Sequence, residues 1–314
     1  MNVTPLRLVP CYQSYLWGGQ RLKTEFGRAD APEVCAESWE LSALTAGESL
    51  TEDGLSLNTL GRRAFWGSAA CEGDFPLLVK LIDAARPLSI QVHPSDDTAI
   101  AALGEHGKAE MWYIVDCAPQ SFLYFGFSRR VGRDEFLARA RDGTICDVLN
   151  RVRVKRDDVF FIPPGTVHAI GEGILIAEIQ QSSNTTFRVF DYNRLGADGK
   201  PRALHLERAA QTVDLDPIVP SESRSNGSLT LPGGRITTLY RGRYFSVRRV
   251  DCAGVLPLAT SERSFQHLLC LSGNAEIRYH GKAYPLTAGS SYFLPAALGA
   301  YALRGRCRAL LSQI

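Results

Sequence analysis

Along most of the chain, short segments of alternating apolar and polar residues, or of apolar residues only, are separated by Gly, Pro or Asp. This spacing is typical of the short strands of an antiparallel sandwich or barrel, so it predicts a mainly β fold. The strands expected in the first two thirds of the chain are 75–83, 88–93, 111–117, 121–125, 159–162, 174–180 and 187–191.

Three segments depart from the strand pattern. Residues 133–152 place apolar side chains close to every 3.6 residues, which predicts a helix that Gly143 interrupts. Residues 96–103 and 205–213 predict shorter helices. We therefore expect helical insertions, mainly over about residues 96–150, within a β domain.

A segment rich in Ser, Gly and Pro, residues 221–234, predicts a domain boundary. We expect a larger domain over residues 1–222 and a smaller all-β domain over 235–314. In the smaller domain, glycines recur every eight residues as hairpin turns would: Gly273, Gly281 and Gly289. The strands expected there are 236–240, 244–251, 267–271, 275–279, 283–286, 291–294 and 301–303.

Composition excludes some classes of partner. The 314 residues have a net charge of +2 and are 45% hydrophobic, which suits a globular core and gives no electrostatic reason to expect a nucleic acid or a membrane surface. The sequence shows no secretory signal and no apolar run long enough to cross a bilayer, so we expect a cytoplasmic protein. Eight widely spaced cysteines without a CxxC pair are expected to be reduced thiols: Cys11, Cys35, Cys71, Cys117, Cys146, Cys252, Cys270 and Cys307.

The segment PLSIQVHP, residues 87–94, combines a strand pattern with two potential metal ligands. Alternate side chains of a strand share a face, so Gln91 and His93 point together while Ile90 and Val92 point to the opposite side. The apolar pair suits a core, which leaves Gln91 and His93 facing a cavity or the surface. Such a pair serves either a functional site or the structure of the strand end.

Two further segments carry polar residues beside buried strands. Glu110 opens the apolar strand GKAEMWYI, where a carboxylate is costly unless it is paired or binds a metal, and Lys108 would share its face. The alternative is a surface ion pair between these two residues. His168 follows a Pro-Pro-Gly turn after the strand VFFI, and such a turn can hold a ligand rigidly.

Together these segments offer two imidazoles, one carboxylate and one amide from three separate strands: Gln91, His93, Glu110 and His168. Nitrogen and oxygen donors of this kind suit a divalent metal such as zinc. Because no thiolate takes part, the site would stay open to water or substrate, as catalytic metal sites do. These residues therefore predict one catalytic divalent metal ion per chain, such as zinc.

The motifs that carry these residues resemble, in order, those of the type I mannose-6-phosphate isomerases, in particular the short bacterial members. The matching segments are YLWGGQRL (15–22), AESWELS (36–42), LSIQVHP, GKAEMWY, IPPGTVHAIGEGILIAEIQQSSNTTFRVFDY and SGNAEIRYHGKAYPLTAGSSYFLPA (272–296). The resemblance covers nearly the whole chain. It implies a cupin fold, a small jelly-roll barrel, for the zinc-binding domain and a second, metal-free cupin-like β domain.

The resemblance also implies an activity and a set of site residues. The activity is zinc-dependent interconversion of D-mannose 6-phosphate and D-fructose 6-phosphate through an enediol, with a hexose phosphate as the small-molecule partner. Carried over by motif, the zinc ligands are Gln91, His93, Glu110 and His168. The family's active-site Arg is Arg188, and Lys108 and Glu178 also fall on family active-site positions. Oligomeric state is left open, with a monomer or a weak homo-oligomer expected.

Three positions depart from the commonest pattern of the resembled family. Met111 stands in place of a frequent Cys, Pro164 of a frequent Ala, and Asn184 of a frequent Asp. None is a predicted ligand, so the expected activity is unchanged. Asn184 leaves the finer substrate contacts open.

Aldose–ketose isomerisation moves a proton between C1 and C2, so it needs a base and stabilisation of charge on the neighbouring oxygens. Arg188 and Lys108 would stabilise that charge or bind the phosphate. Glu178 shares a strand face with two isoleucines, which predicts a buried carboxylate of raised pKa that moves the proton; the alternative is a structural ion pair with Arg188. Lys80, within an apolar run, would line the pocket and meet the phosphate, or else extend its ammonium to the end of the barrel.

Other functions fit parts of the pattern. Two His and a Glu can bind the ferrous iron of a cupin oxygenase, although Gln91 in a fourth position, with Lys108 and Arg188, favours a phosphorylated substrate. A non-catalytic sugar-phosphate sensor on the same fold is a second alternative. Preference for glucose 6-phosphate over mannose 6-phosphate is a third, because the sequence does not place the contacts that distinguish epimers.

Overall fold

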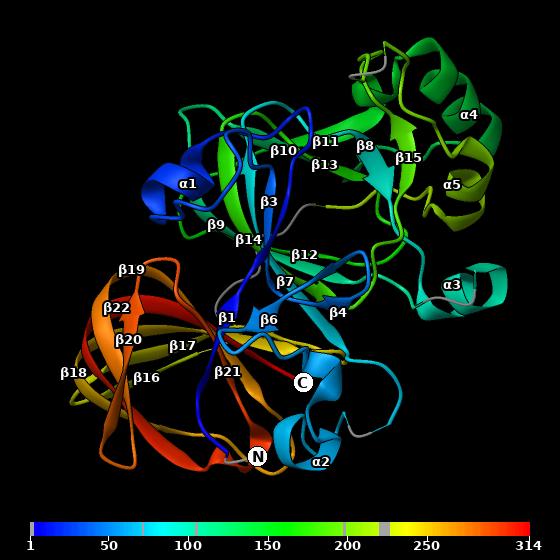
Figure 1. Cartoon of the computed structure of the whole chain (residues 1–314). Helices are drawn as coiled ribbons and strands as arrows, with labels where there is room; N and C mark the ends of the chain where they lie inside the picture. The colour runs from blue at the N-terminus through cyan, green and yellow to red at the C-terminus, as the bar shows by residue number, and fades with distance from the viewer. Residues whose placement is uncertain (1–2, 71, 104–105, 197–198, 220–226) are drawn as a thin grey trace.

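The computed structural model describes residues 3–70, 72–103, 106–196, 199–219 and 227–314, without the side chains of residues 100–103. Three sheets make up most of it (Figure 1). The mainly β fold predicted from the sequence is confirmed. No helix of the described residues is long and apolar enough to cross a membrane.

The six-stranded sheet forms the centre of the molecule. Its strands lie in the order β12 (Val159–Ile162), β9 (Glu110–Cys117), β14 (Ile174–Gln181), β7 (Leu77–Ala84), β3 (Glu37–Leu41) and β2 (Cys11–Gln13). Strands β7 and β14 are buried along their whole length. Because both faces of this sheet are covered, these strands read as continuous apolar runs rather than as alternating patterns.

The five-stranded sheet packs face to face with the six-stranded sheet to form a barrel. Its strands lie in the order β11 (Leu149–Arg153), β10 (Phe122–Phe127), β13 (His168–Ile170), β8 (Ile90–Val92) and β15 (Phe187–Phe190). Apolar side chains of both sheets meet in one interior cluster that includes Ile82, Trp112, Ile176 and Leu123. The outer face of the five-stranded sheet is covered by helices α4 (Arg133–Asp142) and α5 (Leu206–Thr212).

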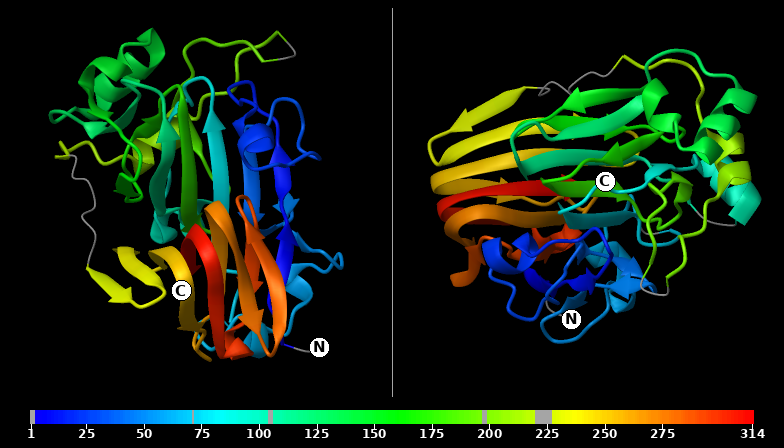
Figure 2. Two further views of the ribbon diagram at one scale, coloured as in Figure 1. Left: turned by 90° about the vertical axis from the view of Figure 1, so that its left-hand side faces the viewer. Right: turned by 90° about the horizontal axis from the view of Figure 1, so that it is seen from above.

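The nine-stranded sheet lies against the other face of the six-stranded sheet. Its main path is β16 (Ser228–Leu231), β17 (Gly234–Arg241), β18 (Ser246–Ala259), β22 (Ala300–Gln313), β19 (Gln266–Tyr279), β21 (Ser291–Leu294), β1 (Leu6–Val9) and β6 (Leu50–Thr51), with β20 (Lys282–Thr287) paired to β19. Side chains such as Val79 and Met111 of the central sheet and Phe265 and Phe293 of the nine-stranded sheet share one large core. Figure 2 shows blue β1 beside the orange and red strands, where Leu6 pairs with Phe293.

Short elements complete the fold. They are α1 (Arg21–Glu25), α2 (Arg62–Phe65), α3 (Asp96–Leu103), the 3₁₀ turns η1 (Leu57–Thr59), η2 (Ile145–Val148) and η3 (Ala296–Leu298), and the small hairpin β4 (Ala43–Leu44)–β5 (Gly47–Glu48). The helices predicted at 96–103 and 205–213 correspond to α3 and α5. The predicted interruption of the helical pattern at Gly143 is confirmed, because α4 ends at Asp142 and Gly143 caps it at φ 83°. The helical pattern expected to continue to residue 152 is wrong, because residues 149–152 belong to β11.

Two expectations for the smaller domain are wrong in detail. Residues 228–231, expected within a linker, form edge strand β16, while residues 220–226 lie outside the described part of the chain. Gly281 and Gly289 lie in the turns that flank β20, as predicted, but Gly273 lies inside the long strand β19. A Cβ at Gly273 would come within 2.3 Å of the carbonyl oxygen of Arg306 on β22, so close strand packing rather than a turn requires this glycine.

The cysteines of the described residues are free thiols, as expected: Cys11, Cys35, Cys117, Cys146, Cys252, Cys270 and Cys307. Cys71 lies outside the described residues.

Candidate active site

At one end of the barrel, the interior face of the six-stranded sheet changes from apolar to charged. On β14, Ile174 and Ile176 are followed on the same face by Glu178, and on the neighbouring β7, Lys80 pairs in register with Glu178. The aliphatic residues join the interior core, whereas Glu178 and Lys80 line a cavity. Because alternate residues of a strand share a face, the strands that place aliphatic side chains inside the barrel also place Glu178 and Lys80 there, at one end.

Three of the four predicted ligands converge at this end. The ligand atoms of His93, Glu110 and His168 all lie within 4.8 Å of one another, and all three side chains are buried. Nε2 of His93 lies 3.3 Å from Oε1 of Glu110, and Nε2 of His168 lies 3.7 Å from Oε2. The three side chains thus form one compact group of nitrogen and oxygen donors. Strands β9 and β13 and the residue after β8 supply them.

Backbone carbonyls orient both imidazoles. Nδ1 of His93 lies 3.0 Å from the carbonyl oxygen of Thr185, and Nδ1 of His168 lies 2.8 Å from that of Thr166. Each ring therefore donates Nδ1–H and leaves the lone pair of Nε2 facing Glu110. Burial lowers the pKa of both rings, that of His93 to about 3, so both are neutral, which is the form that binds a metal.

Glu110 is fully buried, and neither of its oxygens accepts a regularly oriented hydrogen bond among the described residues. Its charge is balanced by Lys108, whose Nζ lies 2.5 Å from Oε1 and 3.2 Å from Nε2 of His93. Burial opposes ionisation of Glu110, but the positive charge of Lys108 outweighs it and holds the pKa of Glu110 well below the usual range. An ionised, buried carboxylate beside two imidazole lone pairs is a donor set that fits a divalent metal ion.

Gln91 lies beside this cluster. Its side-chain Nε2 is 3.4 Å from Nε2 of His168, and rotation of the amide by 180° would present the carbonyl oxygen to the same place. The predicted alternation of β8 is confirmed, because Ile90 and Val92 pack in the core under α4 and α5 on the opposite face. Gln91 as a fourth ligand stays a prediction.

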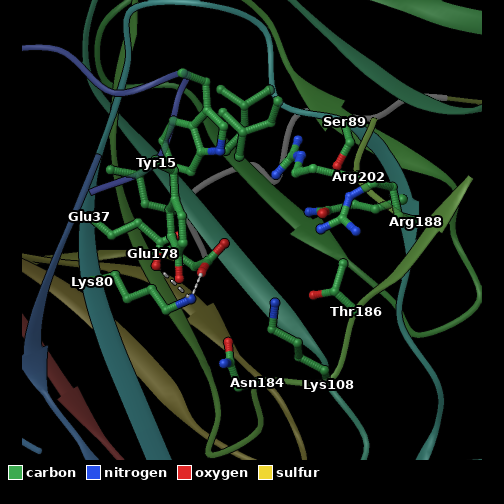
Figure 3. Close-up of a pocket in the computed structure, with 15 residues that line it drawn as sticks. Tyr15, Glu37, Lys80, Ser89, Lys108, Glu178, Asn184, Thr186, Arg188 and Arg202 are labelled. Atoms are coloured by element: carbon green, nitrogen blue, oxygen red, sulfur yellow. Dashed lines mark ion pairs between the residues drawn. The ribbon is translucent and has the colours of Figure 1, made fainter. Parts of the chain in front are cut away.

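A cavity of about 250 Å³ opens beside the cluster (Figure 3). Lys80, Glu37 and Glu178 lie on one side of it, and Ser89, Arg188 and Arg202 lie on the opposite side. Lys108 and Asn184 lie between the two sides. The remaining lining residues are Tyr15, Trp17, Ile82, Leu88, Gln91, Ile170 and Thr186.

Lys80 joins two carboxylates at the carboxylate side. Its Nζ lies 3.3 Å from Oε2 of Glu37 and 3.4 Å from Oε1 of Glu178, and all three side chains are nearly or fully buried. Burial, followed by the negative charge of Glu110, raises the pKa of Glu178, as the sequence predicted. The charged partner of Glu178 is Lys80 rather than Arg188. Lys80 lines the cavity as expected but points to the carboxylates within it, and its contact with phosphate stays a prediction.

Arginines form the opposite side. Arg188 on β15 donates from Nη1 to the carbonyl oxygen of Ala203 at 2.9 Å, and its Nε is buried without an acceptor in the described structure. Arg202 lies beside it in the segment between β15 and α5. Burial, followed by the charge of Arg202, lowers the pKa of Arg188. Two adjacent guanidinium groups facing a cavity provide a strong site for an oxyanion.

Sequence reasoning missed Glu37 and Arg202. Glu37 lies in the motif AESWELS, where alternation from Trp39 could have placed it on the interior face of β3. Arg202 lies outside any strand or helix, so no periodic pattern identifies it. Of the departures from the resembled family, Asn184 lines the cavity, whereas Met111 packs in the core between the sheets and the smaller domain.

Comparison with known proteins agrees with this architecture. Residues 6–118 match the family described as phosphomannose isomerase type I, catalytic domain, and residues 235–314 match mannose-6-phosphate isomerase, cupin domain. A putative mannose-6-phosphate isomerase (YvyI) of Bacillus subtilis is 35% identical over the full length of both chains. Mannose-6-phosphate isomerase ManA of the same organism is 34% identical, also over the full length of both.

Solved structures show the same fold. The crystal structure of mannose 6-phosphate isomerase from Bacillus subtilis superposes with a TM-score of 0.92 at 34% identity, over 99% of this chain and 100% of the other. A putative mannosephosphate isomerase from Archaeoglobus fulgidus shares the fold with a TM-score of 0.79 at 23% identity, over 99% and 98%. The chain described here therefore belongs to the type I mannose-6-phosphate isomerase family of cupin-fold isomerases.

Proposed function

We propose that the enzyme interconverts D-mannose 6-phosphate and D-fructose 6-phosphate in a zinc-dependent reaction that passes through an enediol. The observation that carries the proposal is the buried cluster of His93, Glu110 and His168 beside a cavity that has carboxylates on one side and arginines on the other. The relatives named mannose-6-phosphate isomerase match over the whole chain, which supports the same substrate class here.

His93, Glu110 and His168, with Gln91 as the fourth donor, would hold the zinc ion. When bound, zinc supplies Lewis-acid stabilisation of negative charge on the sugar oxygens. Lys108, adjacent to Glu110, adds a second positive charge at the same end of the cavity. The charge that develops on the enediolate oxygens is thereby met by cations already fixed in place.

Glu178 is the proposed proton-transfer group between C1 and C2. Its raised pKa and buried position suit a carboxylate that accepts and returns a proton within one catalytic cycle. The ammonium of Lys80 keeps one carboxylate oxygen in place, and the indole of Trp112 holds the other. On the opposite side, Arg188 and Arg202 would bind the phosphate, which orients the sugar chain between the phosphate and the metal.

The proposal is tested by metal removal in a coupled assay with mannose 6-phosphate and, separately, glucose 6-phosphate. Chelation should abolish formation of fructose 6-phosphate from the mannose substrate, and zinc should restore it. Full activity in protein verified as metal-free would contradict zinc dependence. A faster reaction with glucose 6-phosphate would reassign the substrate epimer.

Two further measurements separate the alternative functions. A sugar-phosphate sensor would bind hexose phosphates without exchanging the C2 proton with solvent, so exchange measured by NMR in deuterated water favours the isomerase. An oxygenase would contain iron and consume oxygen, so metal analysis and an oxygen electrode distinguish it from the proposed enzyme.

A further inference from the structure

We propose that Asp191 is a positioning residue that holds Arg202 at the cavity wall and thereby determines how tightly the enzyme binds the phosphate of its substrate. This inference rests on the proposed function, because it assigns a ligand to one side of the same cavity. Asp191 follows β15 directly, is 4% exposed and does not line the cavity. It acts only through the arginines that it contacts.

Asp191 accepts hydrogen bonds from two arginines, Arg202 and Arg194. Arg202 donates from Nε to Oδ2 at 2.7 Å and from Nη2 to Oδ1 at 2.6 Å, which fixes the plane of its guanidinium. Arg194 also donates to Oδ1, and its Nη1 donates to the carbonyl oxygen of Pro87 at 2.6 Å. Burial opposes ionisation of Asp191, but the hydrogen bonds from both arginines outweigh it and lower its pKa.

The backbone brings Arg202 next to Arg188. The backbone N–H of Arg188 donates to Nδ1 of His205 at 3.0 Å, and the N–H of His205 donates to the carbonyl oxygen of Arg188 at 2.8 Å. The segment 202–205 is therefore fixed along the edge of β15. Within it, the side chain of Arg202 could still turn towards solvent, since it is partly exposed. The two hydrogen bonds to Asp191 prevent that rotation.

An electrostatic role and a positioning role of Asp191 predict opposite effects of its removal on phosphate binding. Three guanidinium groups, those of Arg188, Arg194 and Arg202, lie near one carboxylate, which accepts hydrogen bonds from Arg194 and Arg202, so this side of the cavity keeps a positive excess that suits a phosphate dianion. If Asp191 only weakened this field, its removal would strengthen phosphate binding. If Asp191 positions Arg202, its removal frees the side chain and weakens phosphate binding. The sign of the change therefore decides between the two roles.

The test uses the zinc-loaded full-length enzyme with mannose 6-phosphate as substrate and inorganic phosphate as competitive inhibitor. For Asp191→Ala we expect KM and the inhibition constant of phosphate to rise together by about tenfold or more, with kcat changed by less than about threefold. Asp191→Asn keeps one acceptor oxygen, so it should give a smaller rise in both constants. A fall in either constant, or no change in both, would overturn the proposal.

A double-mutant cycle tests whether Asp191 acts through Arg202. Arg202→Ala alone should raise KM and the inhibition constant at least as much as Asp191→Ala, and adding Asp191→Ala to it should have less than a twofold further effect. Additive effects would remove Arg202 from the proposal. A wild-type enzyme that does not isomerise mannose 6-phosphate would instead defeat the proposed function, while phosphate binding measured by calorimetry would still test Asp191.

The chain offers a matched control. Asp251, on β18 in the smaller domain, also accepts hydrogen bonds from two arginines: Nε of Arg249 at 2.9 Å and Nε of Arg308 at 2.7 Å. It does not line the cavity. Asp251→Ala should leave KM and the inhibition constant of phosphate unchanged, which separates a general loss of an Asp–Arg cluster from the specific loss at Asp191.

Discussion

The indole Nε1 of Trp112 donates a hydrogen bond of 2.8 Å to Oε2 of Glu178, and both side chains are buried. The two residues lie opposite each other on β9 and β14. The same indole also packs against the ring of His168 in a T-shaped arrangement, with 5.3 Å between the ring centroids. One side chain thus contacts both the proposed proton-transfer group and a proposed metal ligand.

Replacement of Trp112 by Phe should move the acidic limb of the kcat–pH profile to higher pH. A donor to a carboxylate stabilises its charged form, so loss of the indole N–H raises the pKa of Glu178 further, by roughly one unit. The ionised form of Glu178, which accepts the proton in the proposed reaction, then predominates only at higher pH. Trp39→Phe is the matched control, because Trp39 donates to Glu37, the other carboxylate bound to Lys80. A shift of equal size in both variants would argue against a specific effect on Glu178.

Replacement of Glu110 by Gln should remove the metal. The substitution keeps the volume but removes the anion that the two imidazoles and Lys108 surround, so we expect zinc affinity to fall at least about tenfold, with activity lost in proportion. Metal stoichiometry after dialysis measures this. Glu37→Gln, which changes a carboxylate on the far side of Lys80, should retain zinc. Full zinc occupancy in the Glu110 variant would exclude Glu110 as a ligand.

Replacement of Arg188 by Ala should reduce kcat/KM for mannose 6-phosphate by about 10²-fold while zinc content stays unchanged, because the proposed phosphate contact is lost. Arg188 lines the cavity, and among the described residues it makes no hydrogen bond or ion pair with His93, Glu110 or His168, so its loss affects the substrate rather than the metal. Steady-state kinetics together with metal analysis check both parts. An unchanged rate would remove Arg188 from the mechanism.

His267 should make the fold sensitive to acid. It is fully buried on β19, hydrogen-bonded through Nε2 to Oγ of Ser291 at 2.8 Å, and burial lowers its pKa to about 3. Between pH 6.5 and 3 the unfolded chain takes up a proton here that the native protein does not. The free energy of unfolding therefore falls as pH decreases through this window, by up to about 1.4 kcal/mol per pH unit.

The measurement is denaturant unfolding at several pH values between 4 and 7. His267→Gln should reduce the slope of the free energy of unfolding against pH by the contribution of one titrating group. His280, which is exposed in the turn after β19 at φ 45°, provides the control, since Asn tolerates that backbone conformation and His280→Asn should leave the slope unchanged. An identical slope in the wild type and the His267 variant would show that other groups account for the acid sensitivity.

Local patterns predicted much of the barrel. Strand alternation placed Gln91 opposite the core residues Ile90 and Val92, and the mix of apolar neighbours and charge placed Glu178 in a buried position of raised pKa. These predictions succeed because the side-chain period of a strand is independent of what the strand pairs with. The strand segments and the family motifs indicated the same set of metal ligands, and the structure brings His93, Glu110 and His168 together.

Local sequence patterns do not predict which distant segments of the chain lie side by side. Arg202 owes its position to Asp191 and to backbone contacts of His205 with β15, in a segment without periodic structure. The partner of Glu178 depends on β14 and β7 being neighbours, which no local pattern encodes. The linker expected at 221–234 contains strand β16, because the four residues Ser228–Leu231 are too few for an alternating pattern to stand out among the flanking Ser, Gly and Pro residues.

The pairing of Leu6 with Phe293 has a consequence for biosynthesis. Strand β1 is synthesised long before β21, because most of the described chain separates Leu6 from Phe293, so the pairing of the two strands forms late. Until β21 has been made, β1 lacks this partner and presents an unpaired edge of the kind that recruits other chains. A fragment starting at residue 235 would lack β1 and would leave the edge of β21 unpaired, and deletion of residues 6–9 alone would expose the same edge.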